Sequence, residues 1–329
     1  MPITRRELAP LIGGAALFPL AARAQEPTRC IGVLTGNVET DRDAQARVRA
    51  FKESLNARRD GENDTVRFEV RWPGADLSRQ QRAAEELVSL APEVILATST
   101  ATTRALRKAT TSIPIVFVGL SDPTATGVVS DLAHPEANVT GFMLYEHPMA
   151  GKWLGLLKAM VPDIARVGLL FNTDTAPYAS NYLRTAKEVG EQLHVSITTI
   201  DVHRAGEIEP ALAAFAGPGH AGLVVLPDGG FMSVNKSVVI GTAAGSGLPA
   251  IYGARFYVVD GGLMSYGADL TGQFRDGADY VDRILRGAVT ADLPVQFSTR
   301  FDLVVNSAAA DALGLTIPPQ LLVDAELIE

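Results

Sequence analysis

The sequence predicts an α/β protein made of two doubly wound, parallel-sheet lobes. Short apolar, β-rich segments alternate with amphipathic helical segments along the chain, a pattern typical of parallel sheets with helices on both faces. The alternation forms two successive series of similar length, and no polar or low-complexity linker separates them. A chain of 329 residues also exceeds one typical core, which favours two domains.

The first series begins with the apolar segment Cys30–Thr35, which predicts a buried strand. The helix Asp41–Ala57 follows, and Ser78 is expected to cap a helix that ends at Ser89, with Gln81 completing a capping box. The other elements expected here are the strands Val66–Trp72, Val94–Thr98, Ile115–Val118 and Val139–Phe142, and the helices Thr102–Thr110 and Thr126–Leu132.

The second series repeats the same alternation. Its expected helices are Met149–Met160, Ala176–Leu193, Glu207–Phe215 and Val234–Ser246. Its expected strands are Arg166–Phe171, Ser196–Asp201, Gly222–Leu226, Ala250–Gly253 and Leu263–Tyr266. Two lobes joined by short crossings form a hinged pair with a cleft between them.

Residues 1–24 are typical of an export signal. Arg5 and Arg6 supply positive charge, an apolar run covers residues 8–20, and Ala22-Arg23-Ala24 offers a cleavage site. We expect removal of this signal peptide after Sec or twin-arginine export, which leaves a protein that works outside the cytoplasm. That location excludes most chemistry that depends on ATP or nicotinamide. The alternative is a poorly ordered N-terminus of a cytosolic protein.

Composition narrows the partners and the chemistry. The formal charge is −8, and removal of residues 1–24, which carry a net +2, leaves −10, so a nucleic-acid partner is not expected. Cys30 is the sole cysteine, which excludes an intrachain disulfide. The five histidines show no i, i+4 pair, and the G-x-G-x-x-G match at Gly217–Gly222 precedes a strand instead of following one. We therefore expect no metal site, no cofactor and no catalytic set.

Ligands of open parallel sheets bind beyond the carboxyl ends of the strands, and this rule selects the candidate site. Hydroxyls at Ser99 and Thr100 open a helix and suit a carboxylate, although one of them would also serve as an ordinary N-cap. Tyrosines at strand ends offer apolar walls with hydroxyl groups, or simply core packing. The expected ligand-contacting residues are Thr35, Asn37, Ser99, Thr100, Asp122, Tyr145, Asn172, Asp228, Tyr252 and Tyr266.

Several sequence blocks together resemble one known family. They are Ile113–Gly119 followed by Asp122-Pro123, Asn138–Gly141, Leu156–Pro162, Leu248–Gly267 and Leu313–Pro319. On these blocks the chain resembles the periplasmic substrate-binding proteins of ABC transporters, in the tryptophan/aromatic-amino-acid-binding-like group with the type I periplasmic binding fold.

The resemblance implies a non-catalytic periplasmic receptor, expected to be a monomer. It would close around a small solute, an amino acid or similar small carboxylate, and deliver it to an ABC permease in the inner membrane. Ser99 and Thr100 would hold the carboxylate, Asp122, Asn172 and Asp228 would surround the ammonium group, and Tyr252 would lie against the side chain. Arg104 departs from the family's pattern, and an inward position for it would favour a more acidic solute.

The expected lobes are each built from non-contiguous segments joined by three hinge crossings. The first lobe covers 25–142 plus about 270–294, and the second covers 143–269 plus about 295–329. The crossings are expected at 143–148, near Tyr266–Thr271 and near Asn306–Leu313.

Two alternative functions would also use the cleft between the lobes. One is a secreted two-lobed enzyme, for which Asp122 and Asp228 are the candidate acid and base. Replacement of both by Asn would abolish turnover in an enzyme and weaken affinity in a binding protein. The other is a ligand-sensing domain that signals to a membrane sensor.

Overall fold

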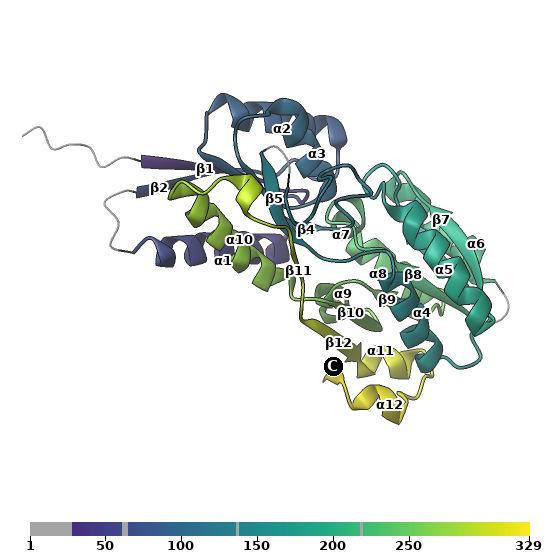
Figure 1. Ribbon diagram of the computed structural model, residues 1–329. Helices are drawn as coiled ribbons and strands as arrows, with labels where there is room; N and C mark the ends of the chain where they lie inside the picture. Colours follow the sequence, from purple (N-terminus) through teal and green to yellow (C-terminus); the bar gives the residue numbers. More distant parts are fainter. Residues whose placement is uncertain (1–27, 61–64, 136–137, 218–219) are drawn as a thin grey trace, which may run out of the picture.

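The computed structural model describes residues 28–60, 65–135, 138–217 and 220–329 and shows two α/β lobes side by side (Figure 1). The predicted signal peptide lies outside these residues. Each lobe has its own sheet, as the two series predicted. In the part of the chain that the structure describes, the sheets have six and seven strands, because β11 (Gln296–Phe297), β12 (Phe301–Asn306) and β13 (Ala325–Ile328), which were not predicted, join the ten expected strands. No helix among the described residues is long and apolar enough to cross a membrane.

The sheet of the first lobe is parallel throughout, in the order β11-β5-β4-β3-β1-β2. Its strands are β1 (Thr28–Leu34), β2 (Thr65–Arg71), β3 (Val94–Ala97), β4 (Ile115–Leu120), β5 (Val139–Met143) and β11 (Gln296–Phe297). Helices α1 (Arg42–Arg58) and α10 (Leu270–Leu285) pack together on one face, and α2 (Leu77–Ser89) and α3 (Thr100–Ala109) pack on the other (Figure 1).

The sheet of the second lobe has the order β13-β12-β10-β9-β8-β6-β7. Its strands are β6 (Arg166–Phe171), β7 (Ser196–Asp201), β8 (Ala221–Val225), β9 (Ala250–Tyr252), β10 (Met264–Ala268), β12 (Phe301–Asn306) and β13 (Ala325–Ile328). Its helices are α4 (Met149–Met160), α5 (Ala179–Leu193), α6 (Ala205–Ala216), α7 (Phe231–Val234), α8 (Lys236–Gly245), α9 (Arg255–Val259), α11 (Ser307–Ala312) and α12 (Pro319–Leu322). Strand β12 runs antiparallel to β10, so this sheet is not wholly parallel.

The chain passes between the two sheets after β5, after β10 and after β11. Tyr145, in the first of these passages, ties two of them together, because its hydroxyl donates to the Gly253 carbonyl and accepts from the Ala268 N–H at 3.0 Å. The third passage was wrongly predicted near Asn306–Leu313. Those residues form the end of β12 and α11 within the second lobe, and the passage lies just after β11, which pairs with β5.

Two local expectations were also wrong. Asp76 caps α2, because its carboxylate accepts from the Arg79 N–H at 2.9 Å, so the helix starts before Ser78. The segment Thr126–Leu132 forms turns and bends instead of a helix. Asp122 explains the start of that segment, since its side chain accepts from Ala125 N–H at 3.3 Å and holds a turn.

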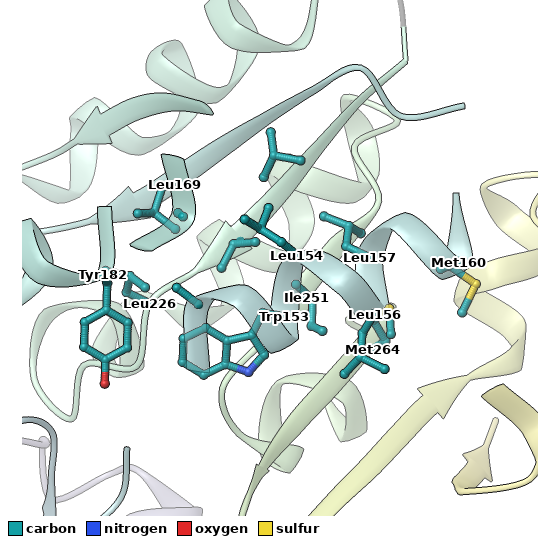
Figure 2. Close-up of a cluster of buried hydrophobic side chains, with 14 of the residues drawn as sticks. Trp153, Leu154, Leu156, Leu157, Met160, Leu169, Tyr182, Leu226, Ile251 and Met264 are labelled. Atoms are coloured by element: carbon teal, nitrogen blue, oxygen red, sulfur yellow. The ribbon is translucent and has the colours of Figure 1, made fainter. Parts of the chain in front are cut away.

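The second lobe has a dense apolar core around Trp153, which is fully buried (Figure 2). The ring lies 5.5 Å from Tyr145 and 6.0 Å from Tyr182 between centroids, and its Nε1–H donates to the Tyr266 carbonyl at 2.8 Å. Trp153 therefore connects the core of this lobe to two of the passages between the sheets.

Candidate ligand-binding site between the lobes

A small cavity lies where the two lobes face one another, and we call it the interlobe cavity. The volume open to the centre of a water-sized sphere is about 40 Å³ in this cavity. By the same measure it is about 260 Å³ in a neighbouring opening, which shares some of the lining residues. Its polar lining residues are Thr35, Asn37, Arg47, Thr98, Tyr145, Ser233 and Tyr257. Its apolar and glycine lining residues are Ala44, Val48, Gly119, Leu144, Pro227, Gly229, Gly253, Ala254, Phe256, Ala268, Leu270 and Phe274.

The carboxyl ends of the strands supply most of this lining. Thr35 and Asn37 follow β1, Thr98 follows β3, Pro227 and Gly229 follow β8, and the segment 253–257 follows β9. Both lobes contribute because the carboxyl ends of their sheets point toward the same cleft. The rule used in the sequence analysis thus finds the loops, but it does not decide which side chains in them are free.

Three of the predicted residues line the cavity, and each also holds local structure. The Thr35 hydroxyl donates to the Asn37 carbonyl at 3.1 Å, and the Asn37 amide donates to Asp41 at 2.9 Å. Tyr145 bridges two passages between the lobes, and burial raises the pKa of its hydroxyl. These contacts keep the cavity's polar groups in fixed positions.

Ser99 and Thr100 lie beside the cavity, next to the lining residue Thr98. The Ser99 hydroxyl accepts from the Thr102 N–H at 3.2 Å and lies 3.0 Å from the Thr102 hydroxyl, so Ser99 forms a capping box at the start of α3. Both residues are buried, yet the Ser99 hydroxyl is engaged in the ordinary capping role that the sequence left open.

The three predicted ammonium ligands are buried but are engaged in turns outside the cavity lining. Asn172 accepts from the Asp174 N–H at 2.8 Å. The Asp228 carboxylate accepts from the Thr175 hydroxyl at 2.6 Å and from the Gly230 N–H at 2.8 Å. Burial raises the pKa of Asp228, and these donors act in the opposite direction.

The remaining predicted residues lie outside the lining. The Tyr252 ring is buried and stacks on Tyr257 with centroids 4.7 Å apart, and Tyr266 stacks on Phe301 with centroids 5.8 Å apart. Arg104 is exposed and lines a separate surface hollow that includes Asp174 and Lys108. It is therefore not an inward-facing cation.

Sequence reasoning missed Arg47, Phe256 and Tyr257. Arg47 is 7% exposed, lines the cavity from α1 and has its guanidinium carbon 5.4 Å from the Phe256 ring centroid. A usable signal was present, because Arg47 falls on the buried stripe of α1, three residues after Ala44 and four residues before Phe51. A charge on an apolar helix face is a candidate functional group.

The two lobes touch across the cleft, as in a closed state. A methyl group built on Gly36 would lie 2.6 Å from the Gly229 carbonyl oxygen of the other lobe. Asn181 donates to Asp122 at 3.3 Å across the cleft. Lys236 of α8 contacts Asp43 of α1 at 2.5 Å and Asp260 of its own lobe at 2.6 Å.

Lys236→Met is expected to weaken apparent solute affinity by about three- to tenfold, because it leaves Asp43 and Asp260 facing one another without their shared cation. Isothermal titration against the bound solute measures the loss. Lys187→Met, on the exposed face of α5, is the control and should keep full affinity. Equal losses in both variants would contradict the role of Lys236 in closure.

Two α/β lobes with a shared cavity at the carboxyl ends of their strands define the class of proteins with the type I periplasmic binding fold. The chain belongs to the ABC transporter substrate-binding protein family, whose model matches residues 35–328. A curated relative is the "Tyrosine-binding protein" of Clostridioides difficile, 21% identical over 267 residues, which covers 81% of this chain and 76% of that protein.

Solved structures share the same fold. A conserved domain protein from Vibrio cholerae is 25% identical with a TM-score of 0.81, covering 93% of this chain and all of that one. An ABC domain from Streptococcus pneumoniae in complex with L-Trp is 23% identical with a TM-score of 0.80, covering 91% and 100%. A ligand-free, open substrate-binding protein from Clostridium difficile gives a lower TM-score of 0.66 at 25% identity, covering 92% and 99%. The lower score for an open form fits the closed arrangement of this chain.

Proposed function

We propose that this chain is the periplasmic solute-binding component of an ABC importer, exported by its N-terminal segment, and that it acts as a monomer. It closes around a small carboxylate and presents the closed form to an inner-membrane permease. The observation that carries the proposal is the cavity lined by both lobes, because a solute that contacts both lobes stabilises the closed state.

The arrangement of the acidic residues supports binding over catalysis. Asp122 and Asp228, the two candidates for an acid–base pair, are held in turns and do not line the cavity. Two of the relatives are described as binding proteins, one for tyrosine and one for a substrate, and a third structure holds L-Trp.

A thermal-shift screen against a library of amino acids, other small carboxylates and sugars tests this function, together with mass spectrometry of solute co-purified with the protein. A solute at about one hundred times its Kd should stabilise the folded protein by about 2.7 kcal/mol. Turnover of a compound without stable binding of any would overturn the proposal.

A further inference from the structure

Among the described residues that line the interlobe cavity, Arg47 is the sole charged one. No hydrogen bond or ion pair joins its guanidinium to any residue that the structure describes, and no carboxylate lies within 4.0 Å. Its neighbour Asp41 instead caps α1 and accepts from Asn37, and Asp43 pairs with Lys236. Burial lowers the pKa of Arg47, and the two aspartates act in the opposite direction, yet an arginine stays charged in proteins.

The contact with Phe256 orients this guanidinium. The guanidinium carbon lies over the Phe256 ring, 5.4 Å from the ring centroid, which is a cation–π distance. A guanidinium presents its N–H donors in one plane, as a fork that can bind a carboxylate with two parallel hydrogen bonds.

Tyr257 supplies a second, independent sign of a missing ligand. Its side chain is 3% exposed and lines the cavity, and its hydroxyl has no hydrogen-bond partner within 3.5 Å among the described residues. Its polar neighbour is the Ser233 hydroxyl, which already donates to the Asp228 carbonyl at 2.7 Å. Leaving a buried hydroxyl unpaired costs about 1–3 kcal/mol, so a bound polar atom at this position would remove that cost.

The cavity offers no free anion for an ammonium group. None of the described residues that line it is Asp or Glu, and the nearby Asp228 carboxylate is turned toward Thr175 and the turn at Gly230. Asp43, Asp269 and Asp302 line the neighbouring opening. Asp43 pairs there with Lys236, and Asp269 accepts from the Gly272 N–H at 2.8 Å. A buried ammonium without an anionic partner is strongly unfavourable. A doubly charged phosphate would likewise need more cations than the single Arg47.

We propose that Arg47 binds the carboxylate of a solute that has an apolar body and no ammonium group, with the Tyr257 hydroxyl at its polar end. This inference rests on the proposed solute-binding function and narrows its ligand to deaminated organic acids. The apolar lining from Val48, Leu144 and Phe274 then covers the body of the solute.

Titration calorimetry with four pairs of compounds tests the proposal. The pairs are phenylalanine with 3-phenylpropanoate, tyrosine with 3-(4-hydroxyphenyl)propanoate, tryptophan with 3-(indol-3-yl)propanoate, and leucine with 4-methylpentanoate. At least one acid should bind tenfold more tightly than its amino acid. Tighter binding of the amino acids, or binding of none of the acids, would overturn the inference.

Substitutions at two arginines of α1 test whether Arg47 is the residue that binds the carboxylate. Arg47→Gln should weaken binding of the acid about 30-fold or more. The affinity of Arg47→Lys for the acid should lie between those of Arg47→Gln and the wild type. Arg49→Gln, an exposed position on α1, is the matched control and should bind normally. Melting temperatures of the unliganded variants report folding separately. Unchanged affinity in Arg47→Gln would contradict the proposal.

Failure of this inference and failure of the proposed function give different results. A sugar or amino acid recovered with the protein, bound with unchanged affinity by Arg47→Gln, overturns the acid assignment and leaves the solute-binding function in place. Turnover without stable binding in the library screen overturns the function itself.

Discussion

Gly36→Ala is expected to lower solute affinity about tenfold or more while leaving the unliganded protein fully folded. In the closed form an added methyl group would lie 2.6 Å from the Gly229 carbonyl oxygen, which belongs to the backbone of the opposite lobe. A backbone oxygen cannot rotate away, so the lobes must separate. Gly36 does not have a positive φ, so alanine introduces no backbone strain at this position.

Two measurements separate this effect from misfolding. The unliganded variant should melt within a few degrees of the wild type, because each lobe keeps its own core. With saturating solute, small-angle scattering should show a larger radius of gyration than for the liganded wild type. Gly155→Ala is the matched control, since a methyl group there meets nothing within 4 Å. A Gly36→Ala protein that binds normally and stays compact would show that this closed arrangement is not the binding state.

Strands β1 to β10 and the two-lobe architecture were predictable because local patterns determine them, whereas β11, β12 and β13 were not assigned from the sequence. Segments such as Arg166–Phe171 are continuous apolar runs, and buried parallel strands require such runs. Helix α10 was not assigned from the sequence, although Phe274, Ala278 and Val281 follow helical spacing. The return of this segment to the first lobe was expected with the three-crossing arrangement and not from any local pattern.

The candidate site was predictable at the level of loops and not of side chains. The carboxyl ends of β1, β3, β8 and β9 do line the cavity, as the sheet rule predicts. Whether a polar side chain faces a ligand or a turn depends on its neighbours in three dimensions. In the sequence, Asp228 and Asp122 cannot be told apart from aspartates that bind a ligand. In the structure, however, the Asp228 carboxylate accepts a hydrogen bond from Thr175, and the Asp122 carboxylate accepts one from Asn181.

Arg47 shows the opposite case, in which a residue with no motif occupies the centre of the site. Its position on a buried helix face is visible in the sequence, but its partner is Phe256, more than two hundred residues away and in the other lobe. Only closure of the lobes brings these two groups together. The residues of a site formed between two lobes therefore cannot be predicted from the sequence pattern of any single helix or strand.

Trp153→Ala is expected to lower the free energy of unfolding by about 3–5 kcal/mol, the largest loss among the substitutions proposed for this chain. The indole is fully buried in the core of the second lobe, near Tyr182 (Figure 2). Its ring also packs edge-on against Tyr145. Truncation leaves a cavity that a packed core cannot close, and it removes the hydrogen bond from Nε1 to the Tyr266 carbonyl.

Urea unfolding followed by circular dichroism measures this loss, and Trp72→Ala is the chemically matched control. Trp72, the other tryptophan of the chain, is only partly buried next to the edge strand β2, so its truncation should cost clearly less. The loss in the free energy of unfolding for Trp153→Phe should lie between those of Trp153→Ala and Trp72→Ala. Phenylalanine fills part of the space but leaves the Tyr266 carbonyl without its donor. Because Trp153 also packs on Tyr145, which joins two passages between the lobes, Trp153→Phe should weaken solute affinity as well. Equal stability of the Trp153→Ala and Trp72→Ala proteins would contradict the central place of Trp153 in the second lobe.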